Sequence, residues 1–134
     1  MLHTLQSLIY IAVILYARRQ HAWAYGAGCF IAAFWNYANL FATNFIAAGM
    51  QQVATLVRTG HLHRPDLFIA VIAAAGHFLL IAGCIAGFLR MRPGGKQYAL
   101  FAGGGVLAIG YFALIIVTTG PQYIPLLRRV FHAG

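Results

Sequence analysis

Apolar stretches long enough to cross a lipid bilayer dominate this sequence. Four of them can be marked, and they take up most of the 134 residues, at about 2–17, 22–50, 67–89 and 98–117. A transmembrane helix needs roughly 20 predominantly apolar residues. Because apolar residues run through each stretch without the alternation of a lipid-facing strand, the sequence predicts membrane-spanning helices and not a β-barrel.

The predicted fold class is all-α integral membrane, with four transmembrane helices in an antiparallel bundle and a short interfacial C-terminal tail at 118–134. Hydrophobic residues make up 62% of the chain and charged residues 7%, whereas soluble domains carry about 25% charged residues. Short connections after the first and third stretches favour antiparallel hairpins. Residues 1–134 then form one transmembrane domain, with no room for a separate soluble module.

Local signals suggest where these helices begin, end and touch. The second stretch exceeds the roughly 20 residues that a bilayer requires, so we expect it to tilt or to continue as a surface helix through Gln51, Gln52 and Arg58. Asp66, after Pro65, stands in the position of an N-cap for the third helix. Close helix contacts are expected at small residues, namely Gly83, Gly87, Gly103, Gly104, Gly105 and Gly110.

Basic residues lie at the ends of the stretches and give a net charge of +8. One side of the bundle would carry Arg18, Arg19, Arg90, Arg92 and Lys96, and the other Arg58, Arg64, Arg128 and Arg129. We expect the first set to be cytoplasmic and both termini to lie on the opposite side, because Arg18 and Arg19 directly follow the first stretch while Met1 to Ser7 carry no lysine or arginine. The predicted partners are anionic lipid headgroups and other membrane subunits or copies of the chain, bound through Arg18, Arg19, Arg90, Arg92, Lys96, Arg128 and Arg129.

The single acidic residue, Asp66, removes several classes of function. Carboxylate acid–base pairs, intramembrane proton relays, di-iron centres and acidic cation filters all need more carboxylates. The sequence also lacks a glycine-rich phosphate loop, a nucleophile elbow and a His-Glu-x-x-His motif. Basic residues in singles and pairs do not form the long patch of a nucleic-acid-binding protein. The sequence therefore favours a protein that is not an enzyme.

Uncharged polar residues gather on one arc of the second stretch. At about 100° per residue, this arc holds Tyr25, Cys29, Asn36, Asn39 and Thr43. It should face helices or a cavity, because an unsatisfied amide in hydrocarbon costs several kcal/mol. Two interpretations stay open, hydrogen bonds between helices and the wall of a ligand or cofactor site.

His77 is the ionisable residue deepest in a predicted span. It lies 77 − 66 = 11 positions beyond Asp66, which at about 1.5 Å per residue places it near the middle of the bilayer. Tyr10, Asn36 and Tyr111 reach a similar depth, and we expect a midplane polar cluster with Asn39 beside it. An ionisable residue there is a functional candidate. His77 could ligate haem or a chlorin, hydrogen-bond a quinone, or stay neutral and bond Asn36 or a tyrosine; the sequence requires no cofactor.

Two smaller motifs involve residues that can bind metal. His61 and His63 could begin a copper or zinc site, but two imidazoles do not complete one, and a solvated loop is the favoured interpretation. Cys29 and Cys84 fall at comparable depth on antiparallel helices. Their use as small packing residues is favoured over a disulfide.

In layout the chain resembles the MAPEG family of glutathione and eicosanoid membrane enzymes. The resemblance rests on the length, the four spans, the asparagine-bearing second span and His77 followed by an arginine-rich turn. That family's second helix carries an arginine and a glutamate that have no counterpart among Asn36, Asn39, Thr43 and Asn44. The resemblance thus implies four membrane helices, and glutathione chemistry would lack these two residues.

From these features we expect a non-catalytic integral-membrane subunit, either an accessory component of a larger membrane assembly or a homo-oligomer. A rival hypothesis is an electron-transfer protein that binds haem, chlorin or quinone at His77. A third is a small transporter or channel lined by the arc around Asn36.

Overall fold

The computed structural model describes residues 2–121, 124–125 and 128, and in this part of the chain every regular element is helical. The helices are α1 (Leu2–Ala17), α2 (Ala22–Tyr37), the π-helix η1 (Ala38–Ala42), α3 (Phe45–Thr59), α4 (Pro65–Arg90) and α5 (Gly95–Thr119). The predicted all-α class is confirmed. Most of the predicted interfacial tail at 118–134 lies outside the described residues.

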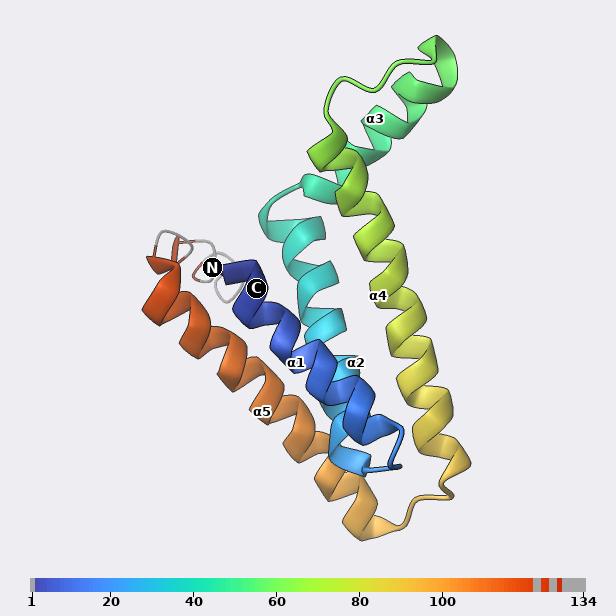
Figure 1. Ribbon diagram of the computed structural model, residues 1–134, viewed down its shortest axis with the longest axis vertical. Coiled ribbons are helices and arrows are strands. Elements are labelled where there is room, and N and C mark those ends of the chain that lie inside the picture. The colour runs from blue at the N-terminus through green and yellow to red at the C-terminus, as the bar shows by residue number, and fades with distance from the viewer. Residues whose placement is uncertain (1, 122–123, 126–127, 129–134) are drawn as a thin grey trace.

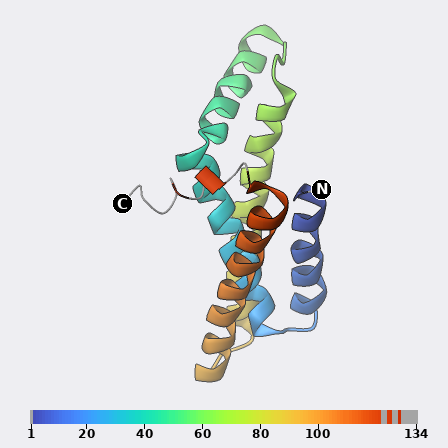
Figure 2. The same ribbon diagram turned by 90° about the vertical axis from the view of Figure 1, so that its left-hand side faces the viewer.

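The helix α2 occupies the centre of the arrangement. It packs against α5, α4 and α1, and α1 also contacts α5. The helices α1 and α4 run in one direction, and α2 and α5 run in the other (Figure 1). The hairpin of α3 and α4 extends beyond the ends of the other helices, as the view from the side also shows (Figure 2). The short connections α1–α2 and α4–α5 meet at the opposite end (Figure 1).

The hydrophobic core belongs to three of these helices. Its buried cluster takes residues from α1, α2 and α5, namely Ile9, Val13, Ala27, Ile31, Ala108, Phe112 and Ile116. The helix α4 contributes none of them, and its buried residues are Ala74, Cys84 and Phe88. The chain therefore consists of a packed three-helix core with α4 attached along the outside of α2.

Helix length and composition set how much of the chain can cross a membrane. Among the described residues, α4 and α5 are each long and apolar enough to span a bilayer, and α2 together with α3 makes up to a third span. The helix α1 has 16 residues, or about 24 Å at 1.5 Å per residue, which is shorter than a hydrocarbon core of about 30 Å. These findings are consistent with a multi-pass membrane protein.

The prediction of one continuous helix over 22–50 is wrong. The π-helix η1 ends α2, and α3 starts at Phe45 with its axis bent by 72°. Asn44 adopts a left-handed backbone with φ 56°, which asparagine tolerates better than most residues. The Thr43 hydroxyl accepts the backbone N–H of Phe45 at 3.3 Å. Short polar side chains thus satisfy the backbone locally and end the helix, which the apolar pattern does not reveal.

The start of α4 also differs from the prediction. The helix begins at Pro65, which suits a first position because the missing N–H would have no partner there. Asp66 lies inside the first turn and is not the N-cap. At the next helix start, the Gln97 side chain accepts the backbone N–H of Gly94 at 3.1 Å, which caps α5.

The glycines divide into two groups. A Cβ at Gly104 would collide with the backbone of Trp23, and one at Gly105 or Gly87 would press on an aromatic ring. These three predicted contacts are confirmed. A Cβ at Gly83, Gly103 or Gly110 would meet open space, so the predicted contacts there are wrong within the chain. Gly26 makes a further close contact that the sequence pattern does not predict, since a Cβ there would collide with the backbone of Phe101.

Candidate functional site

A hydrogen bond joins α1 to α4 at the level where the sequence predicts a polar cluster. The Tyr10 hydroxyl lies 3.0 Å from Nε2 of His77. The two rings are stacked, with centroids 5.9 Å apart and planes 19° from parallel. Both side chains are half-buried. A bond between His77 and a tyrosine was one of the predicted possibilities, and the structure contains it.

Asn36 brings α2 to the same turn of α4. Its side chain is 4% exposed, and Nδ2 donates to the carbonyl oxygen of Ala74 at 3.5 Å. Ala74 lies one helical turn before His77. This contact confirms that the polar arc on α2 faces another helix at Asn36.

Three polar atoms in this region are buried without a hydrogen-bond partner: Oδ1 of Asn36, Nδ1 of His77 and Nε1 of Trp35. Each such atom in a low-dielectric interior costs about 1–3 kcal/mol. The amide oxygen accepts, the indole donates, and the imidazole nitrogen does either according to its tautomer. The Trp35 ring packs on Phe112 of α5 whereas Asn36 contacts α4, so only Oδ1 of Asn36 and Nδ1 of His77 belong to the side of the bundle that faces α4.

The geometry around His77 also constrains metal ligation. The iron of a haem or the magnesium of a chlorin would bind the lone pair of an imidazole nitrogen. Nε2 of His77 is already hydrogen-bonded to Tyr10. Ligation through Nε2 would first require this hydrogen bond to break. A hydrogen-bonding ligand would leave the Tyr10–His77 bond intact, because Nδ1 of His77 and Oδ1 of Asn36 are unpaired, but both atoms are buried and would first have to be uncovered.

Other members of the predicted arc bond elsewhere. Asn39 donates from Nδ2 to the carbonyl oxygen of Trp35 at 3.0 Å, within its own helix. The Thr43 hydroxyl reaches the Asn39 carbonyl oxygen at 3.4 Å. Tyr25 donates to the last carbonyl of α1, at Ala17, at 3.0 Å. Asn39 and Thr43 therefore do not join helices, whereas Tyr25 and Asn36 do.

Tyr111 packs against the buried cluster of α1, α2 and α5, as Tyr10 and Trp35 do. The predicted group of four thus divides into a bonded pair, Tyr10 with His77, a buried amide one turn away, and a tyrosine against the core. Trp35 was missed, although its position next to Asn36 in the sequence could have suggested it.

The weak metal candidates His61 and His63 are exposed in the connection between α3 and α4. No group of three or more histidine, cysteine, aspartate or glutamate side chains comes together in the part of the chain that the structure describes. Cys29 and Cys84 are both free thiols. Cys84 is buried in the contact of α4 with α2, which fits a packing role.

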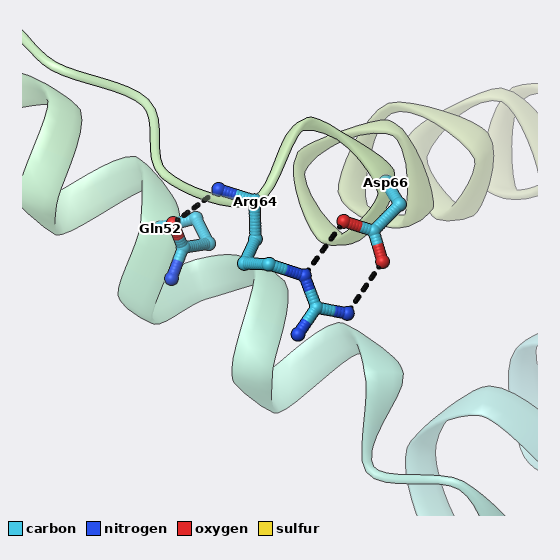
Figure 3. Close-up of polar contacts among 3 residues, drawn as sticks. All are labelled: Gln52, Arg64 and Asp66. Atoms are coloured by element: carbon cyan, nitrogen blue, oxygen red, sulfur yellow. Dashed lines mark hydrogen bonds and ion pairs between the residues drawn. The ribbon is translucent and has the colours of Figure 1, made fainter.

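The only acidic residue is neutralised at the start of α4. Arg64 donates to both carboxylate oxygens of Asp66, at 2.9 Å and 2.7 Å, and its backbone N–H donates to the Gln52 side chain at 3.1 Å (Figure 3). Asp66 precedes the apolar segment at 67–89 and is exposed. The hydrogen bonds from Arg64 hold the pKa of this carboxyl below its usual value.

The predicted lipid- and partner-binding residues are exposed wherever the structure describes them, at Arg18, Arg19, Arg90, Arg92, Lys96 and Arg128. Arg129 lies outside the described residues. Arg18 and Arg19 follow α1, and the other three basic residues of that set surround the α4–α5 connection, so all five lie at one end of the bundle (Figure 1).

No protein-family model matches this chain, and no curated protein or solved structure is significantly similar to it. The functional interpretation therefore depends on the residues themselves.

Proposed function

We propose that this protein is a non-catalytic subunit of the membrane, which crosses the bilayer four times and serves as a structural component of a larger membrane assembly or of a homo-oligomer. The four spans would be α1, α2 with η1, α4 and α5.

The observation that carries this proposal is the exposure of α4. Its most apolar 18-residue window has 11% of its residues buried within the chain, against 33% for α5. The outward side chains are large and apolar, including Ile69, Ile72, Phe78, Leu79 and Ile85. An apolar surface of this length requires a cover of lipid or of another apolar chain.

Cysteine cross-linking in native membranes tests the role in an assembly. In a chain whose native Cys29 and Cys84 are replaced by alanine, Leu79→Cys places a thiol on the outward face of α4, where Leu79 is 75% exposed. We expect a discrete cross-linked product that contains this chain. Val106→Cys, at a 72% exposed position on α5, is the matched control for random collision.

Native mass spectrometry of the gently extracted protein completes this test, because it reports co-purifying chains and copies together. A monomer without companion chains, combined with equal cross-linking at residues 79 and 106, would refute the assembly role.

A second candidate function is binding of a hydrogen-bonding cofactor, such as a quinone, beside His77. It is favoured by the unpaired Oδ1 of Asn36 and Nδ1 of His77. The visible and ultraviolet absorption of the purified protein, compared with His77→Ala and Asn36→Leu, tests this function. A cofactor band lost in both variants would support it, and a spectrum of protein alone in the native complex would refute it.

We also propose that the end with Arg18, Arg19, Arg90, Arg92 and Lys96 faces the cytoplasm, since these five basic residues flank short connections. A membrane-impermeant maleimide distinguishes the two orientations. In the cysteine-free chain within intact cells, Gly60→Cys should react and Lys96→Cys should not.

A further inference from the structure

A small, half-open surface cavity lies at the C-terminal end of α1. Leu15, Tyr16 and Arg19 line it, and its volume is about 180 Å³. The lining thus combines an aliphatic side chain, a phenol and a guanidinium. Such a combination suits a ligand with both apolar and anionic parts.

Aromatic contacts hold the wall of this cavity in place. The Tyr16 ring contacts His21 edge-on at 5.6 Å and Trp23 at 5.0 Å between centroids. Tyrosine and tryptophan are enriched at the boundary between hydrocarbon and headgroups. In the bilayer placement proposed above, the cavity lies at the depth where a lipid headgroup joins its chains.

The backbone that carries Arg19 is fixed by four hydrogen bonds. The backbone N–H of Gln20 donates to the carbonyl oxygen of Ala17 at 2.9 Å. The N–H groups of Arg19 and His21 both donate to the carbonyl oxygen of Tyr16, each at 3.1 Å. Tyr25 also bonds the carbonyl oxygen of Ala17. These bonds form a Schellman-type helix end, which directs the chain away from α1 and keeps Arg19 at its tip.

An apolar track leads from the cavity along α1. Leu8, Ile11 and Leu15 are spaced by three and four residues, which places them on one face of the helix, and they are 50%, 51% and 54% exposed. Arg19 lies just beyond the end of α1 and lines the same cavity as Leu15. This face therefore presents an apolar line with a cation at one end.

Within the part of the chain that the structure describes, Arg19 has no counter-ion. The chain contains one acidic side chain, Asp66, and it is paired with Arg64 at the start of α4. Arg18 and Arg19 are exposed. A guanidinium binds a phosphate through two parallel hydrogen bonds, which a lysine cannot do.

From the cavity, the apolar track and the unpaired charge, we propose that this end of α1 is a binding site for one anionic glycerophospholipid. Its phosphate binds Arg19, its glycerol region fills the cavity against Tyr16, and an acyl chain lies along Ile11 and Leu8. This inference rests on the bilayer placement proposed above and is independent of the assembly role.

Tryptophan fluorescence provides the test, because the chain has two tryptophans and Trp23 contacts the cavity wall. The variant Trp35→Phe keeps Trp23 as the single reporter. It is reconstituted into phosphatidylcholine vesicles in which a rising fraction of lipid is phosphatidylglycerol with brominated acyl chains. We expect more quenching than the bulk fraction predicts, with a preference of about fivefold, the effect of one basic residue near an anionic surface.

Matched variants test whether Arg19 causes the preference for phosphatidylglycerol. In the single-tryptophan chain, Arg19→Gln should abolish the preference, whereas Arg58→Gln, at an exposed arginine in the last turn of α3, should retain it. Equal loss in both variants would overturn the proposal in favour of diffuse attraction by the net positive charge of the chain. Circular dichroism of each variant verifies the helical fold, and Arg19→Lys should recover only part of the preference because it lacks the paired donors.

Two further measurements distinguish a lipid site from a free-phosphate site and from failure of the bilayer placement. Inorganic phosphate that displaces phosphatidylglycerol from Trp23 at millimolar concentration would overturn the lipid proposal in favour of a free phosphate. Quenching by brominated phosphatidylcholine alone shows insertion, so its absence would refute the bilayer placement. Insertion without a preference for phosphatidylglycerol would refute only the lipid site.

Discussion

The contact of α2 with α5 and the outward face of α4 are built from the same residue types and have opposite surroundings. In the first, Gly26 and Gly104 allow the backbones to touch across the two helices. On the second, Gly76 and Gly83 face open space. Hydrophobicity does not separate these regions, since α4 and α5 have mean hydropathies of 2.4 and 2.3 over their apolar windows.

The difference shows that packing against a backbone, and not burial of apolar surface, distinguishes the inside of this protein. In a bilayer, lipid tails solvate leucine as well as a neighbouring helix does, so association depends on close contact and on hydrogen bonds. The α2–α5 contact has the close approach, and α4 is held to the core by Asn36 and Tyr10. The following predictions test this comparison.

The largest effect is expected from Gly104→Leu. A side chain there would push against the backbone of Trp23, which cannot move aside without separating α2 from α5. We expect a loss of about 3 kcal/mol or more in the free energy of unfolding, measured by denaturation in detergent micelles. The control is Gly103→Leu, at the preceding open position, which should leave stability unchanged. Equal effects of the two substitutions would contradict the proposed difference.

A smaller loss is expected from Tyr10→Phe, which leaves Nε2 of His77 without its partner. Hydrogen bonds between membrane helices contribute about 0.6 kcal/mol on average and up to about 1–2 kcal/mol. The thermal midpoint in micelles should therefore fall by a few degrees. Tyr37→Phe, at an exposed tyrosine, is the control. No change for Tyr10→Phe would mean that the Tyr10–His77 hydrogen bond does not contribute to holding α4 against the core.

A substitution at Gln20, just after the end of α1, should stabilise the protein instead. Gln20 has a left-handed backbone with φ 57°, a conformation that costs a non-glycine residue about 1 kcal/mol or more. Gln20→Gly should raise the free energy of unfolding by up to about this amount, while Gln20→Ala should not. A decrease with glycine would show that the Gln20 side chain makes a stabilising contact.

The smallest effect is expected at the Arg64–Asp66 pair. Because Arg64 lowers the pKa of the Asp66 carboxyl, the pair stabilises the folded state above the ordinary value of 3.8 and loses this contribution as the pH falls further. Both side chains are more than half exposed, so solvent screens the pair. The pH dependence of the thermal midpoint between pH 5 and 3 should change only slightly in Asp66→Asn. A large change would show that the α3–α4 hairpin depends on this pair.

Much of the fold could be predicted because its signals are local. Continuous apolar stretches predict helices wherever they occur, and Pro65 and Pro121 mark boundaries close to those observed. The break at Thr43 and Asn44 was missed, because the apolar residues on both sides resemble one longer helix and the two side chains act on their own backbone. Likewise, the sequence shows where the glycines are, but it does not show which of them contact a neighbouring helix.

The candidate site was predicted in part for the same reason. Counting residues from the helix ends places Tyr10, Asn36 and His77 at a common depth, because the rise per residue is constant. Depth does not determine direction around each helix. Asn39 therefore bonds its own backbone, and Trp35 has a buried indole nitrogen that depth alone does not reveal.

The sequence by itself determined that this protein is helical, apolar over bilayer lengths, and basic at its helix ends with one acidic residue. These properties follow from composition and from periodicity along a short segment. Only the tertiary structure decided that Tyr10 bonds His77, that Gly104 and not Gly103 meets α2, and that α4 lies outside the core. Such choices depend on the rotation and crossing of helices that are distant in the chain, which packing of the whole molecule sets.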